Sequence, residues 1–193
     1  METLVENRWY TQDFIEPWWT PEDYVNFDYK HVPFNDPAQQ VEWESWGFDQ
    51  ARYTGELYGM PDEEPTFLKG FKEAFQWKHW SWQLYRMMPG TTIPCHADTY
   101  EKFREINGIV DPNTIWRAVV FLEDWQSGHY FEIDGTNLSY WKKGDFVVWQ
   151  NAVKHLAANL GQTPRYTIQI TGVIDNDMPK FTDTLEKTAK SKK

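Results

Sequence analysis

The 193-residue sequence lacks the features that mark a disulfide-rich, membrane-spanning or secreted protein. Its one cysteine, Cys95, has no partner in the chain, so an intramolecular disulfide is excluded. No run approaches the roughly 18 consecutive apolar residues that a membrane-spanning helix needs. The first residues, METLVENRWY, do not follow the charged and then apolar pattern of a signal peptide. We therefore expect no membrane association and a reducing, cytoplasmic location.

Positive charge is scarce in the first part of the chain. The net charge is −10, and residues 1–75 hold 16 of the 29 acidic side chains but only 5 of the 19 basic ones. An acidic surface repels a phosphate backbone, so nucleic-acid binding is not expected. Aromatic residues make up 18% of the sequence and include 12 tryptophans. Because so much aromatic surface must be buried, general disorder is excluded.

The first 80 residues are expected to form a cover of short helices and irregular segments. Residues Thr20-Pro21-Glu22-Asp23 resemble a helix start, with Thr20 as the N-cap and proline in the first turn. Tryptophans and tyrosines in this region are expected to pack it onto a neighbouring sheet. We therefore predict a single domain over 1–193, in which 1–80 cover a core at 81–173. Prolines interrupt every long periodic run of the cover; they are Pro17, Pro21, Pro33, Pro37, Pro61 and Pro65.

From residue 81 the sequence changes to eight short β-rich runs separated by turn residues such as Pro89-Gly90 and Lys143-Gly144. Eight strands without intervening helices indicate a sandwich, barrel or jelly roll, and not a parallel α/β fold. Residues 174–193 turn polar, and we expect them to form a tail with a short helix. The eight runs are WQLYRMM, TTIPCHAD, TIWRAVVFLED, YFEID, NLSYW, DFVVWQ, KHLAANL and RYTIQITGV.

Three side chains in these runs are candidate ligands of a divalent metal. His96 and Asp98 are separated by one residue at the end of a strand-like run, so the two-residue period of a strand puts both on one face. His155 lies 57 positions after Asp98 and can supply a third ligand if the sheet curls back. Two histidines and one carboxylate leave coordination positions open, as in non-haem Fe(II) oxygenases.

A candidate anion-binding arginine begins the last run. Arg165 stands ten residues after His155, and Thr167 shares its face. An oxygenase that uses 2-oxoglutarate must neutralise the carboxylate that does not chelate the metal, and the planar guanidinium fits a carboxylate in a bidentate manner. Thr167 could add a hydroxyl donor.

Together these residues resemble a known family. His96-Ala97-Asp98, His155 and Arg165-Tyr166-Thr167 are similar to the HxD…H…RxS pattern of Fe(II)/2-oxoglutarate-dependent oxygenases. The resemblance covers about residues 81–173. It implies a mainly β protein with N-terminal helices and a double-stranded β-helix core, which is a jelly-roll, cupin-like fold. It also implies Fe(II) held by the catalytic residues His96, Asp98 and His155, with 2-oxoglutarate and O2 as cosubstrates and ascorbate as a reductant.

Two branches of this family share features with the sequence. Met88-Pro89-Gly90 and Phe121-Leu122-Glu123-Asp124-Trp125 resemble the prolyl 4-hydroxylase branch, whereas Trp141-Lys142-Lys143-Gly144-Asp145 resembles the aspartyl/asparaginyl hydroxylase branch. The sequence departs from the first branch at His129, where that branch has a second glycine, and at Phe121, where it has a tyrosine that binds 2-oxoglutarate. The resemblance implies hydroxylation of an unactivated C–H bond in a peptide or protein side chain, proline first and Asp or Asn second.

Two further residues are candidates for binding the cosubstrate. Tyr85, eleven residues before His96, could supply the phenol that Phe121 lacks, although the turn at Pro89 permits it to face either way. Arg117 could meet a carboxylate of the cosubstrate or of the substrate.

The candidate substrate-binding residues are Gln169, His129 and Arg104. Gln169 shares a face with Arg165, and in the resembled fold that polar face lines the pocket. The alternation of polar and apolar residues also permits this face to point to solvent; we favour the pocket. Trp125 and Trp149 fall beside motif positions and could border it.

Two other functions stay open. One is hydroxylation of a free amino acid or small metabolite, which suits a compact chain. The other belongs to a different class, a non-catalytic cupin-like binding or structural protein. For a protein substrate, the acidic N-terminal cover favours a basic partner segment.

Overall fold

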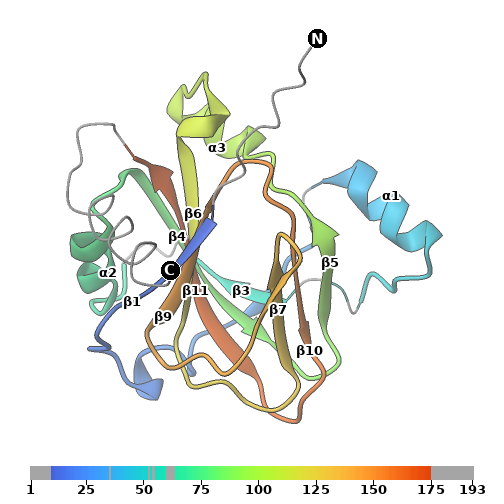
Figure 1. Ribbon diagram of the computed structural model, residues 1–193, viewed down its shortest axis with the longest axis horizontal. Helices are drawn as coiled ribbons and strands as arrows, with labels where there is room; N and C mark the ends of the chain where they lie inside the picture. Colours follow the sequence, from blue (N-terminus) through green and yellow to red (C-terminus); the bar gives the residue numbers. More distant parts are fainter. Residues whose placement is uncertain (1–9, 35, 52, 54, 60–63, 175–193) are drawn as a thin grey trace.

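The computed structural model describes residues 10–34, 36–51, 53, 55–59 and 64–174, which form a sandwich of two antiparallel sheets (Figure 1). The larger sheet has seven strands, in spatial order β1 (Tyr10–Phe14), β9 (Asp145–Gln150), β6 (Ile115–Phe121), β11 (Arg165–Val173), β4 (Lys78–Met87), β3 (Glu56–Tyr58) and β2 (Lys30–His31). The smaller sheet has four, in the order β5 (Thr92–His96), β10 (His155–Asn159), β7 (His129–Ile133) and β8 (Thr136–Leu138). The helices are α1 (Pro37–Ser45), α2 (Leu68–Phe75) and α3 (Glu101–Asn107), with 3₁₀ turns η1 (Pro21–Asp23) and η2 (Pro112–Thr114).

The predicted fold class is confirmed. The eight runs expected after residue 81 are the strands β4 to β11, and the helices α1 and α2 precede them. The expectation that no helix intervenes was wrong, because α3 lies between β5 and β6. The first strand, β4, begins at Lys78, slightly before the predicted start of the core. All of the predicted tail except Ile174 lies outside the described residues, and so does the short helix expected there.

The N-terminal region contains three strands that the sequence pattern did not predict. β1, β2 and β3 extend the larger sheet at both edges, with Phe14 opposite Asp145 and Leu57 opposite Tyr85. They lie among the prolines of the cover and pair with strands elsewhere in the chain, β1 with β9 and β3 with β4, so local alternation does not reveal them. The predicted helix start exists as the 3₁₀ turn η1, where the Thr20 backbone N–H donates to Asp23 Oδ2 at 2.7 Å.

The outer face of the larger sheet is buried under the N-terminal cover. Trp19 packs there with Phe71 of α2, and its Nε1 donates to the Leu122 carbonyl at 3.0 Å. This arrangement agrees with the expectation that aromatic residues fasten the cover to the sheet. The sheet contributes alternate apolar residues of its central strands to this cluster, namely Ala118, Val120, Phe146, Val148, Ile168 and Ile170.

The opposite face of the same strands looks into the sandwich and toward the smaller sheet. Because successive side chains alternate across a strand, the outward Ile168 and Ile170 put Arg165, Thr167 and Gln169 on the inner side of β11. Arg165 and Thr167 are buried, each with 4% of its surface exposed. The polar side of the last strand therefore faces the interior. None of the described helices is both long and apolar enough to span a membrane.

Candidate metal centre

The two histidines of the candidate triad lie side by side because their strands pair. β5 and β10 are antiparallel neighbours in the smaller sheet, and His96 is directly opposite His155. Their ring centroids are 4.3 Å apart, and the residues are 7% and 8% exposed. The ladder shifts register just after His155, and such irregularities re-aim side chains.

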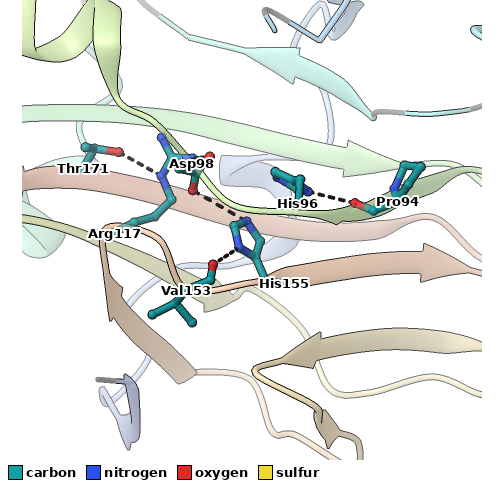
Figure 2. Close-up of polar contacts among 7 residues, drawn as sticks. All are labelled: Pro94, His96, Asp98, Arg117, Val153, His155 and Thr171. Atoms are coloured by element: carbon teal, nitrogen blue, oxygen red, sulfur yellow. Dashed lines mark hydrogen bonds and ion pairs between the residues drawn. The ribbon is translucent and has the colours of Figure 1, made fainter. Parts of the chain in front are cut away.

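Asp98 completes the triad from the segment that leads from β5 to α3. Its Oδ2 is 3.6 Å from His155 Nε2, and Figure 2 shows both groups beside His96. One ligand atom from each of the three residues lies within 4.8 Å of the others. The three residues that were singled out from the sequence therefore lie together in the structure. They offer two nitrogen donors and one oxygen donor on one side of the site.

The ring orientations suit a metal ion. His96 Nδ1 lies 2.8 Å from the Pro94 carbonyl and His155 Nδ1 lies 3.0 Å from the Val153 carbonyl (Figure 2). A carbonyl oxygen only accepts, so each Nδ1 carries the proton and each Nε2 keeps a lone pair. Contacts of this kind orient histidine ligands in metalloproteins.

One oxygen atom of the triad is well placed to bind a cation. Asp98 Oδ2 is buried and has no hydrogen-bond partner among the described residues. A buried carboxylate oxygen without a donor is costly, and a cation held between this oxygen and the two Nε2 atoms removes the cost. The donor set of two imidazoles and one carboxylate fits Fe(II) and other divalent ions that bind N and O ligands.

Arg117 forms an ion pair with the candidate ligand Asp98. The distance from its Nη1 to Asp98 Oδ1 is 2.6 Å. Burial acts to raise the pKa of Asp98, but Arg117 and the two imidazoles outweigh it and lower the pKa to about 2. From the sequence, Arg117 was a candidate for contact with a carboxylate of the cosubstrate or of the substrate. In the structure its carboxylate partner belongs to the protein, because β6 carries Arg117 to the end of the sandwich that holds Asp98.

Aromatic rings surround the histidines. The ring centroids of Phe34 and Trp43 lie 5.0 and 5.8 Å from that of His96, and the ring centroid of Trp149 lies 4.7 Å from that of His155. Burial in these surroundings lowers the pKa of His96, and it lowers that of His155 to about 3. Trp149 was expected to border the pocket, whereas Phe34 and Trp43 were not singled out. No sequence signal separates them from the other aromatics of the cover.

A second cation, Arg165, lies on the inner face of the larger sheet and is buried. Arg165 Nη1 donates to the Tyr130 carbonyl at 2.7 Å, and its Nε is buried without a hydrogen-bond partner among the described residues. Burial lowers the pKa of Arg165 to about 10, which leaves it charged at neutral pH. Two candidate cosubstrate residues are nearby, since Thr167 is also buried on β11 and Tyr85 is its opposite residue on β4.

The facing of Tyr85, which the sequence left open, is inward. Its β4 neighbours Leu84 and Trp82 belong to the outer cluster, so alternation turns Tyr85 toward the interior. Burial raises its pKa to about 12, and both Arg117 and Arg165 oppose this rise. The phenol is therefore within electrostatic reach of Arg117 and Arg165.

The three candidate substrate-binding residues lie in different surroundings. Gln169 is half-buried on the inner side of β11. His129 is buried at the start of β7, with Nε2 3.1 Å from the Thr163 carbonyl and Nδ1 unpartnered among the residues described. Arg104 instead uses its guanidinium to close the turn after α3, where Nη2 donates to the Val110 carbonyl at 2.9 Å. Trp125 donates to the His129 carbonyl at 2.8 Å.

Comparisons with known proteins identify the fold. No protein-family model matches the sequence, and no curated protein matches it. The chain is similar to a prolyl-4-hydroxylase from Pseudomonas putida over 72% of its length and 84% of that protein, with a TM-score of 0.50 and 15% identity. It also matches a protein described as a predicted oxalate decarboxylase from Thermotoga maritima, over 62% and 80% of the two chains (TM-score 0.39, 14% identity). The Cnp3 cupin domain from Schizosaccharomyces pombe matches over 70% of each chain (TM-score 0.38, 12% identity).

The first of these similarities and the two antiparallel sheets show that the chain has the double-stranded β-helix fold of cupin-like proteins. At 15% identity the similarity shows the fold alone. The chemistry must therefore be argued from the residues of this chain.

We predict that His96→Ala, Asp98→Ala and His155→Ala each weaken Mn²⁺ binding by more than about 100-fold, because each change removes one of three protein ligands. Anaerobic calorimetric titration of Mn²⁺ into the apoprotein measures the affinity. His31→Ala is the control, since His31 is exposed on the edge strand β2. Wild-type affinity in all three triad variants would rule out this centre.

A second prediction concerns Glu123, which follows β6 near Arg165. The Tyr166 N–H donates to Glu123 Oε1 at 3.4 Å. Burial raises the pKa of Glu123 from 4.5 to about 7, although this hydrogen bond and Arg165 act in the opposite direction. In the unfolded chain the group ionises near its ordinary pKa, so the folded state holds the proton more tightly.

The stabilisation from this proton is complete below pH 4.5 and is lost as the pH rises through about 7. Glu123→Gln cannot ionise. We expect the free energy of unfolding of Glu123→Gln to gain about 2 kcal/mol on that of wild type between pH 4.5 and pH 8. Urea denaturation over this range measures the difference. Parallel pH profiles for the two proteins would contradict the assignment.

Proposed function

We propose that this protein is an Fe(II)- and 2-oxoglutarate-dependent dioxygenase that hydroxylates an unactivated C–H bond. In this reaction one atom of O2 enters the hydroxyl group and the other enters succinate, with release of CO2. The observation that carries the proposal is the triad of buried His96, buried His155 and largely enclosed Asp98 in one sandwich interior with the buried, charged Arg165. Bound Fe(II) would activate O2. The side chains of the protein would hold the metal, bind the cosubstrate and exclude water.

The triad would hold the metal from one side. Two Nε2 atoms and Asp98 Oδ2 provide three ligands, and a six-coordinate ion keeps three positions for a chelating cosubstrate and O2. The Pro94 and Val153 carbonyls fix the two imidazoles in the tautomer that binds metal. No side chain of the triad needs to lose a proton first, because the imidazoles are neutral and Asp98 is ionised at neutral pH.

Arg165 supports 2-oxoglutarate as the cosubstrate. A 2-oxo acid that chelates the metal through its 1-carboxylate and 2-oxo group leaves a second carboxylate to be neutralised. Arg165 is 4% exposed, so its charge is little screened by water, and its unpartnered Nε offers a hydrogen bond to an anion. Thr167 on the same face and Tyr85 opposite it add hydroxyl groups.

The aromatic rings around the triad would exclude water from the reacting centre. Phe34 and Trp43 border His96, and Trp149 borders His155. Exclusion of water protects a reactive centre from side reactions and strengthens its electrostatic interactions. A site that holds ferrous iron also suits the reducing, cytoplasmic location that we propose.

We further propose that the hydroxylated group belongs to a basic peptide or protein segment. Residues 32–51 carry four acidic and no basic side chains, and Val41 and Trp46 in this segment are 68% and 65% exposed. The same segment contributes Phe34 and Trp43 to the wall beside His96. A partner with positive charge and apolar side chains would therefore be held next to the metal centre.

Arg165→Ala is expected to raise the 2-oxoglutarate concentration for half-maximal binding by about 100-fold, since a buried charge-assisted bond to a carboxylate is lost. Mn²⁺ affinity should change by less than about threefold because Arg165 is outside the triad. Anaerobic titrations of 2-oxoglutarate and of Mn²⁺ measure both quantities. Arg86→Ala is a matched control, because Arg86 pairs with Glu56 at 2.6 Å outside the triad.

Wild-type protein loaded with iron should also release succinate slowly without substrate. Tight metal binding with neither 2-oxoglutarate binding nor succinate release would contradict the dioxygenase and favour a cupin-like binding protein.

The substrate class has its own test. Basic peptides that contain proline should raise succinate release above the substrate-free rate, with Asp or Asn peptides as the second group. The effect should weaken at high salt, which screens charge attraction. Acidic peptides of the same length are the control, and product mass spectrometry locates the added oxygen. Stimulation by free amino acids alone would indicate a small-molecule hydroxylase.

A further inference from the structure

Arg117 is held beside the triad by contacts with three residues, and Figure 2 shows two of them, Asp98 and Thr171. Its Nη1 pairs with Asp98 Oδ1 at 2.6 Å, and its Nε donates to Thr171 Oγ1 on β11 at 3.2 Å. The guanidinium carbon also lies 4.8 Å from the centre of the Tyr100 ring. Contacts on several sides leave Arg117 little freedom to turn away from Asp98.

This arrangement makes the two oxygens of Asp98 different. Oδ1 is occupied by the guanidinium of Arg117, whereas Oδ2 has no hydrogen-bond partner among the described residues and lies toward His155 Nε2. A carboxylate whose second oxygen is held by a neighbouring cation offers its other oxygen to a metal far more readily. Single-oxygen binding by Asp98 leaves a coordination position free that bidentate binding would occupy.

The ion pair also changes the charge around the metal. Each imidazole that keeps its proton on Nδ1, next to a backbone carbonyl, and offers Nε2 to a metal is neutral, and the charges of Asp98 and Arg117 cancel. A divalent ion bound by this group therefore keeps close to its full double charge. A centre of this kind attracts a chelating dianion more strongly than one whose carboxylate ligand is uncompensated.

We propose that Arg117 is a positioning residue that restricts Asp98 to one-oxygen coordination and cancels its charge. The consequence is weaker binding of the metal ion and stronger binding of a chelating dicarboxylate to the loaded centre. This inference rests on the metal centre of the proposed function, but it concerns how Asp98 binds the metal and the charge beside it, and it does not depend on the reaction.

Arg117→Met keeps the length of the side chain and removes its charge. Mn²⁺ should bind this variant at least about tenfold more tightly, because Asp98 is released to the metal. Oxalate should bind the Mn²⁺-loaded variant at least about tenfold more weakly, because a unit charge a few ångströms from the ion is gone. Anaerobic calorimetry measures both constants. Oxalate is the probe because it chelates the metal without a distal carboxylate for Arg165.

Opposite shifts in the two constants separate this role from a merely structural one. If Arg117 only supported the fold, Arg117→Met would weaken the binding of both Mn²⁺ and oxalate or would change neither affinity, and either result would overturn the inference. Arg86→Met removes the 2.6 Å partner of Glu56, outside the triad, and should leave both constants unchanged.

A second pair of variants covers the case in which Arg117→Met does not fold. Arg117→Lys keeps the charge, and Arg117→Gln keeps a hydrogen-bond donor without charge. Oxalate affinity should stay within about threefold of wild type for the lysine variant and fall at least about tenfold for the glutamine variant. Equal oxalate affinity in the two variants would overturn the inference.

The failure of this inference differs from failure of the proposed function. A wild-type protein that binds Mn²⁺ and oxalate but does not turn over 2-oxoglutarate would contradict the dioxygenase and leave the Arg117 test intact. If the wild type turns over 2-oxoglutarate while Arg117→Met loses affinity for both Mn²⁺ and oxalate, the Arg117 inference alone is contradicted.

Discussion

The antiparallel pairing of β5 with β10 is the constraint on which the rest of the site depends. It sets His96 opposite His155 on the inner face of the smaller sheet, with ring centroids 4.3 Å apart. Two imidazoles this close, with their Nδ1 atoms bound to carbonyls, gather two nitrogen lone pairs in a buried volume. A slip of one residue in this register would turn one histidine to the other face of its sheet and separate the donors.

The interior of the sandwich is unusual because it holds charge as well as apolar side chains. Buried polar groups are stable only when they have partners. Asp98 is held by Arg117, and Arg165 is held in part by the Tyr130 carbonyl. The outer face of the same strands carries only apolar residues into its cluster, and the aromatic cover seals it. The alternation of the larger sheet's strands therefore separates an apolar outer face from an inner face that carries Arg165 and Thr167 beside apolar residues such as Val119 and Val147.

The sequence was sufficient to predict the strands of the core and the members of the triad. Local alternation and turn residues located β4 to β11. The short spacing of His96 and Asp98 kept the two side chains together, although β5 ends at His96 and Asp98 lies just beyond the strand. Features that depend on distant pairing were missed. β1, for example, exists because it pairs with β9, more than a hundred residues further along the chain. The ion pair between Arg117 and Asp98 joins β6 to the segment after β5, so no local pattern of residue types could reveal it.

Arg117 and Arg165 differ in how much of their charge remains available. Arg117 is paired at 2.6 Å with an aspartate whose pKa is about 2, so its charge is compensated at any ordinary pH. The carboxylate near Arg165 is Glu123, whose pKa is about 7 and whose oxygen already accepts the Tyr166 N–H. At neutral pH Glu123 is only partly ionised, so it cannot neutralise Arg165 fully. The charge of Arg117 is therefore compensated within the protein, whereas that of Arg165 remains available on the inner face of the larger sheet.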